Sequence, residues 1–185
     1  MGEQHKKHNR REHLNDFHLN VAGEYVYDGA LYACQSDDAK QHRIKRAVWG
    51  MAAILIVAVI AGGCIPAPGM QNCFYVLLPY LGEFLGAASV IWALAKLGTD
   101  WSTVREYNYK KSVAVLPVRT AVTAVFSLLG IVCELIFFFV NDHAGQTFFA
   151  LLYVLLKLIA LLSVLVLRAE IMQAEWDKLP KKNNF

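Results

Sequence analysis

The sequence lacks the short motifs that accompany most enzymatic chemistry. It contains no GxSxG serine motif, no HExxH zinc motif, no phosphate-binding P-loop and no GxGxxG dinucleotide fingerprint. No aspartate lies within its apolar segments, so an aspartyl intramembrane protease has no candidate pair. We therefore expect no enzymatic activity, no catalytic residue and no cofactor.

Cysteine is also scarce, and the four cysteines form no CxxC pair. A quinone-linked thiol oxidoreductase would need a second reactive pair, so this class is disfavoured. Cys64 and Cys73 bracket the segment "CIPAPGMQNC", and their separation makes them a candidate disulfide. The sequence leaves open whether they are bonded.

The N-terminal segment has almost no apolar residues. Residues 1–16 are polar and basic, and we expect a disordered arm. Four histidines lie in or just after this segment: His5, His8, His13 and His18. Their spacing does not place them on one helical face, and no cysteine lies beside them, so no metal site is predicted.

The rest of the chain is rich in apolar residues, which make up 56% of the sequence. They are concentrated in four segments, each close to the ~20 residues that cross a bilayer as a helix. The segments are about 47–65, 74–95, 118–140 and 148–167. The predicted fold class is an all-α membrane protein, with a four-transmembrane-helix bundle at 47–167 and a short N-terminal cytoplasmic β-hairpin.

Positive charge alternates between the connections. Of the 18 lysines and arginines, all but Lys157 and Arg119 lie before the first segment, between the second and third, or after the fourth, and Arg119 is at the very start of the third. Short loops that are rich in lysine and arginine lie on the cytoplasmic side of a membrane. Both termini are therefore predicted to be cytoplasmic, with the protein in the plasma (inner) membrane. Anionic headgroups beside the spans are then sufficient partners for the net charge of +3, and no nucleic acid is needed to explain it.

Residues 17–46 are predicted to form a cytoplasmic hairpin and a linker. Strand-forming residues lie on both sides of Asp28-Gly29, a signature of a two-residue turn. The hairpin could serve as a plug at the inner face or as a partner-recognition element. Residues 168–185 are predicted to extend the fourth helix into the cytoplasm, until Pro180 ends it, and then to form a tail.

Three ionisable residues interrupt the apolar segments. Small and polar residues recur with them at spacings of three and four, which places each series on one helical face. Glu83 and Lys157 each lie about ten residues from the outer boundary, or ~14 Å at helical rise, and Glu134 lies closer to it. We therefore predict that Lys157 pairs mainly with Glu83, within a polar centre that also contains Glu134 and Tyr153.

Other residues of these faces are predicted to govern helix packing. Pro79 favours a kink one turn outside Glu83. Gly82 and Gly86 form a GxxxG pattern, which indicates close helix contact within one chain or between two copies. Gly130 lies in the small-residue stripe of the third segment.

Two functions are compatible with these features. The first is a small polytopic accessory or scaffold subunit, which acts through helix packing and its cytoplasmic face, as a homo-oligomer or with a membrane partner protein. The alternative is an oligomeric proton- or cation-coupled transporter or channel that uses Glu83, Glu134 and Lys157. A dry, paired Glu83 would favour the first, and a water-accessible one the second.

Overall fold

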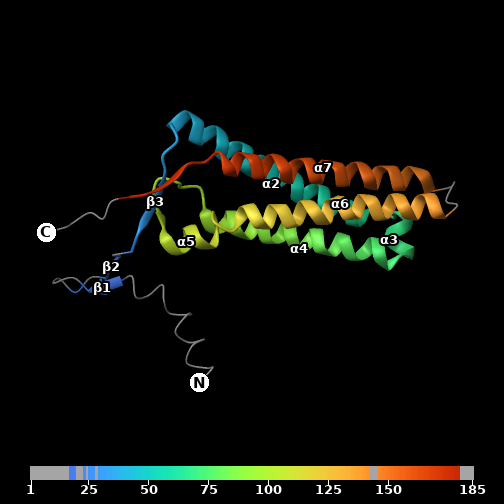
Figure 1. Ribbon diagram of the computed structural model, residues 1–185, viewed down its shortest axis with the longest axis horizontal. Coiled ribbons are helices and arrows are strands. Elements are labelled where there is room, and N and C mark those ends of the chain that lie inside the picture. Colours follow the sequence, from blue (N-terminus) through green and yellow to red (C-terminus); the bar gives the residue numbers. More distant parts are fainter. Residues whose placement is uncertain (1–16, 20–22, 24, 28, 142–145, 180–185) are drawn as a thin grey trace, which may run out of the picture.

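The computed structural model describes residues 17–19, 23, 25–27, 29–141 and 146–179 (Figure 1). The predicted disordered arm at residues 1–16 lies outside the described residues. So do Asp28 of the predicted turn and residues 180–185 of the predicted tail.

Four long helices dominate the structure: α2 (Asp38–Cys64), α4 (Phe74–Leu97), α6 (Leu116–Val140) and α7 (Thr147–Met172). All four are long and apolar enough to cross a membrane, and only 28% to 39% of each apolar window is buried inside the chain. Large apolar side chains face outward along them, among them Leu85 and Phe139, which are 68% and 81% exposed. Soluble proteins rarely expose so much contiguous apolar surface, so this composition suggests a membrane protein.

The four helices run side by side along the long axis of the molecule (Figure 1). α2 packs against α4 and α7, and α6 packs against the same two helices. This order places α4 and α7 on one diagonal of the bundle. Small residues lie at zero or 1% exposure between the helices, where they let the backbones approach closely: Ala52, Ala87, Ala93 and Ala160.

Two helix boundaries differ from the predicted ones. α2 begins at Asp38 rather than near Ala47, because Gln41, Ile44 and Val48 recur at helical spacing and are buried. The prediction that the fourth helix continues to Pro180 is wrong. α7 ends at Met172, and the chain re-enters the structure as a strand.

The strands form two small antiparallel sheets. β1 (Phe17–Leu19) pairs with β2 (Tyr25–Tyr27), whereas β3 (Leu31–Cys34) lies between β4 (Val104–Arg105) and β5 (Trp176–Lys178). The predicted hairpin between residues 25–27 and the strand after Gly29 is therefore wrong. β3 is hydrogen-bonded on both edges by segments that are distant in sequence, which leaves β2 to pair with β1.

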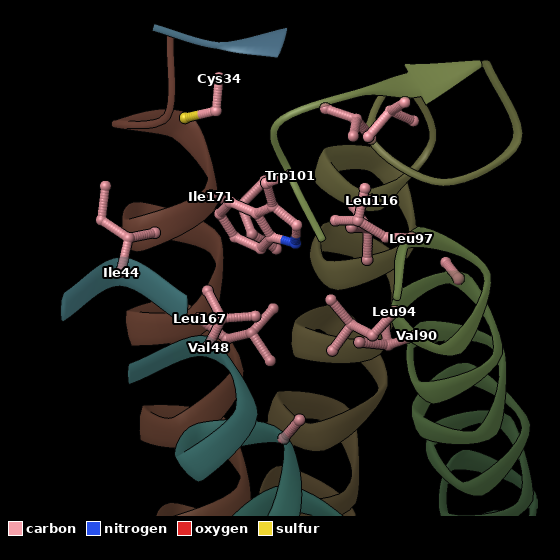
Figure 2. Packing of buried hydrophobic residues seen from close by; sticks show 14 residues of the cluster. Cys34, Ile44, Val48, Val90, Leu94, Leu97, Trp101, Leu116, Leu167 and Ile171 are labelled. Carbon is pink, nitrogen blue, oxygen red and sulfur yellow. The ribbon is translucent and has the colours of Figure 1, made fainter. Parts of the chain in front are cut away.

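An aromatic core fixes the three-stranded sheet to one end of the bundle. Trp101 is 1% exposed, and its ring lies 5.6 Å from that of Trp176 on β5. Figure 2 shows Trp101 among Leu116, Leu97 and Ile171, which come from α6, α4 and α7. The sheet is thus attached to several helices at once.

Two short helices complete the described part of the chain. α3 (Pro68–Asn72) lies at the end opposite to the sheet and packs against α4, α6 and α7. α5 (Glu106–Lys111) directly follows β4. In the loop before β4, the hydroxyl and the backbone N–H of Ser102 both donate to Asp100, and these hydrogen bonds hold the pKa of Asp100 below its usual range.

Candidate functional site

A buried ion pair lies inside the bundle. Lys157 Nζ on α7 contacts Glu83 Oε2 on α4, and the two side chains are 2% and 0% exposed. Ser127 on α6 donates its hydroxyl to the other carboxylate oxygen, Glu83 Oε1, at 2.5 Å. The contact expected from depth and helical face is therefore present. Each oxygen of the Glu83 carboxylate has a partner, and the pair joins the two diagonal helices.

Aromatic rings surround the ammonium group of Lys157. Its Nζ lies 4.7 Å from the ring centroid of Tyr80 and 5.2 Å from that of Tyr153. Gly130 on α6 faces the lysine stem, since a Cβ built there would lie 3.5 Å from Lys157 Cε. The electron-rich ring faces add favourable contacts to a cation that is almost completely buried. Tyr153 therefore lies beside Lys157, as expected, although its own hydroxyl has no hydrogen-bond partner among the described residues.

Glu134 has a hydrogen-bond partner outside the Glu83–Lys157 pair. Its side chain is 0% exposed, and its Oε1 accepts a hydrogen bond from the backbone N–H of Gly69 on α3 at 3.4 Å. Its Oε2 has no partner among the described residues. Lys157 therefore pairs with Glu83, whereas Glu134 is bonded to the backbone of α3.

A small cavity of about 20 Å³ lies next to Glu134, between α6 and α7. Its other walls are apolar side chains of these two helices: Leu135, Phe138, Ala150, Leu151 and Val154. A space of this size is too small for any ligand larger than a water molecule, and the surface that lines it is apolar. Glu134 is consequently the buried carboxyl with unfilled bonding capacity, and Glu83 is the satisfied one.

The GxxxG pattern joins two helices of the same chain. A Cβ built on Gly82 would overlap the ring of Phe126, and one built on Gly86 would lie 2.6 Å from Thr123 Oγ1. Both contacts are on α6. Gly82 and Gly86 therefore allow α4 to approach α6 closely, which resolves the two alternatives in favour of contact within the chain.

Pro79 lies inside α4, where its ring is buried. The residue precedes Glu83 by one helical turn, and it cannot donate a backbone hydrogen bond to the carbonyl of Tyr75. The bend that this would favour stays a prediction.

The candidate disulfide is not formed. All four cysteines are free thiols, Cys64 exposed and Cys73 partly exposed. The intervening helix α3 turns the chain between them, and the backbone N–H of Gly69 attaches it to Glu134 of the bundle. The side-chain amide of Asn72 donates to the carbonyl of Pro68 within α3 itself.

Two partners in the buried site were missed from the sequence. Ser127 belongs to the predicted polar stripe of α6, and its spacing from Glu134 could have marked it as a donor. Gly69 offers no such signal, because it acts through its backbone. Within the described ranges, no group of three histidine, cysteine or acidic side chains lies close enough together to hold a metal ion.

Comparison with known proteins adds no assignment: no family model, curated protein or solved structure matches this chain.

Proposed function

We propose that this chain is a small four-spanning integral membrane protein that acts as an accessory or scaffold subunit rather than as an enzyme. Its termini lie on the cytoplasmic side of the plasma (inner) membrane. The observation that carries the proposal is the state of Glu83: the carboxylate is fully buried, paired with Lys157 and bonded by Ser127.

A cation-coupled transporter needs a carboxylate that water and the transported ion can reach in turn. Glu83 offers neither access nor a vacant oxygen, and Lys157 already occupies the position that a cation would take. The same arrangement suits a structural pair that fixes the relative position of α4 and α7. The buried, paired state of Glu83 therefore favours a protein that acts by associating with partners over one that transports a cation.

The sheet supplies a face for a partner protein. β4 and β5 are its edge strands, so each has one side that β3 does not occupy. Such edges accept an additional strand from a partner, with backbone hydrogen bonds providing affinity. The membrane itself, a second copy of the chain, or another membrane protein completes the set of proposed partners.

Flux measurements in proteoliposomes test the proposal. Wild type, Glu83→Gln and Lys157→Met are each reconstituted, and proton- and cation-driven fluxes are recorded beside empty liposomes. We expect no flux above the empty control, with both variants less stable to heating than wild type. A flux that is present in wild type and lost in Glu83→Gln contradicts the scaffold function.

Glu134 favours a second candidate, the proton- or cation-coupled transporter or channel. Its Oε2 has no partner among the described residues, and a cavity of about 20 Å³ lies beside it. An intramembrane carboxyl in that state is a default candidate for ion handling. The same assay separates the two: flux that survives Glu83→Gln and disappears in Glu134→Gln would establish the transporter and assign its site to Glu134.

A further inference from the structure

An open surface groove of about 420 Å³ follows the outward face of α2, and all of its lining residues among those described come from this one helix. Its lining changes from charged to apolar along the helix. At its N-terminal end it is lined by His42, Arg43 and Arg46, and further on by Gly50, Met51 and Ile54. The apolar run of α2 begins at Ala47, directly after the last arginine. The groove thus extends from a cationic rim onto an apolar surface.

The two arginines are not engaged by the protein. Both are exposed, and among the described residues neither forms an ion pair or hydrogen bond. No residue three or four positions from either of them carries a carboxylate that could neutralise it. Lys45 differs, because it points toward the core and lies 5.6 Å from the ring centroid of Trp101.

Gly50 forms a notch in the groove one turn beyond Arg46. The residue is exposed, and a Cβ built on it would meet no atom within 4 Å. Glycine inside a helix costs ~1 kcal/mol relative to alanine, and packing against this chain gives no reason for it here. Arg46 lies four residues before the notch and Ile54 four residues after it, so all three positions share one face of the helix.

We propose that this groove binds one phospholipid with an anionic headgroup. The phosphate accepts hydrogen bonds from Arg43 and Arg46, and the start of an acyl chain lies over Gly50 against Ile54. Eleven residues of helix separate Arg43 from Ile54, or ~16 Å, which spans the distance from a headgroup into the hydrocarbon. The inference rests on the proposed membrane insertion.

The two ends of the groove together select a lipid rather than a soluble anion. Arginine is suited to phosphate, because its planar fork donates two parallel hydrogen bonds. A soluble phosphate or acidic peptide would use the guanidinium groups but leave the Gly50 notch and Ile54 uncovered. An anionic phospholipid uses both, and juxtamembrane basic residues attract such lipids electrostatically.

Native mass spectrometry of the full chain in detergent tests the site. Phosphatidylglycerol and phosphatidylcholine with identical acyl chains are compared on wild type, Gly50→Leu and the double variant Arg43→Gln/Arg46→Gln. The control is Lys110→Gln/Lys111→Gln, which removes the same charge from α5. Lys110 and Lys111 are already held there by Glu106 and Tyr107.

We expect one retained phosphatidylglycerol per chain in wild type and in the α5 control, in preference to phosphatidylcholine. Both Gly50→Leu and the double arginine variant should lose that preference. Gly50→Leu is decisive, because it fills the notch without changing charge: if it binds as wild type does, or if the α5 control loses binding equally, the site is refuted. Thermal unfolding in the same detergent shows that each variant is folded.

A separate measurement keeps the two proposals apart. Recovery of the wild-type chain in the membrane fraction after alkaline extraction reports insertion alone. A chain that is extracted refutes the proposed membrane function and this site with it. A chain that resists extraction yet shows no preference for phosphatidylglycerol refutes the lipid site only.

Discussion

Lys157 and Glu83 contact each other across the diagonal of the four-helix bundle, from α7 to α4. The neighbouring helices in the ring are joined by apolar and small side chains and by hydrogen bonds such as the one from Ser127 to Glu83, whereas this diagonal is joined by an ion pair. An apolar contact tolerates sliding, but an ion pair between two buried groups has one satisfactory geometry. We therefore expect the pair to fix the register of α4 and α7, and the bundle to be destabilised when either partner is removed.

Gly69→Ala should destabilise the end of the bundle that contains α3. A Cβ at this position would overlap the carboxylate of Glu134 and lie 3.1 Å from Val76 Cγ2. Overpacking of this kind typically costs about 1–3 kcal/mol in free energy of unfolding. Chemical denaturation in detergent measures it. Glu134→Ala in the same chain should recover part of the loss, and equal losses in the single and double variants would contradict the contact.

Gly82→Ala and Gly50→Ala form a matched pair. The first should weaken the packing of α4 on α6, because the added methyl group overlaps the ring of Phe126. The second should leave stability unchanged or raise it by roughly 0.5–1 kcal/mol, since it meets no atom and removes a flexible glycine from a helix. Thermal unfolding of both variants reports the contrast. A reversed order would mean that Gly82 does not lie against α6.

The pairing of β3 with β5 can be tested by cross-linking. Ala33 lies opposite Asp177 in the antiparallel register, and such positions bring their Cβ atoms within about 4.5–5.5 Å. In a chain whose own cysteines are replaced, Ala33→Cys/Asp177→Cys should form a disulfide under mild oxidation, detected by mass before and after reduction. The control Ala33→Cys/Lys178→Cys should remain reduced, because Lys178 points to the other face. Efficient cross-linking of the control alone would show a shifted register.

Cys64 and Cys73 should react with iodoacetamide without prior reduction. Both are free thiols, Cys64 exposed and Cys73 partly so. Peptide mass spectrometry of the unfolded, unreduced chain should find both carrying the alkyl group. A pair that becomes reactive only after treatment with a reductant would restore the disulfide and contradict the structure at this connection.

The long helices and the ion pair were predictable because their signals are local and repetitive. Apolar runs of membrane length mark α2, α4, α6 and α7, and three- and four-residue spacing places Glu83 and Lys157 on inward faces. Helical rise then converts sequence position into depth, which is enough to match the two partners. Glu134 lies on the same kind of face, but its partner is a backbone N–H on α3 that no side-chain pattern reveals.

The small sheet was not predictable for a different reason. β4 and β5 have two and three residues and pair with a strand about 70 residues or more away in the chain. Short strands carry little intrinsic preference, so their partners are set by the packing around them. Here Trp101 and Trp176 bring the segments together. The local signal at Asp28-Gly29 predicted that the two flanking strands pair with each other, whereas β3 pairs with β4 and β5 instead.

The measurement that tests the central claim most directly is a double-mutant cycle on Glu83 and Lys157. The free energies of unfolding are compared for wild type, Glu83→Gln, Lys157→Met and the variant that carries both changes. Each single change leaves a buried group without its partner, and such losses typically cost about 3–5 kcal/mol. The account predicts that the double variant loses much less than the two single losses combined. Additive losses, or single variants as stable as wild type, would contradict a structural ion pair across the bundle.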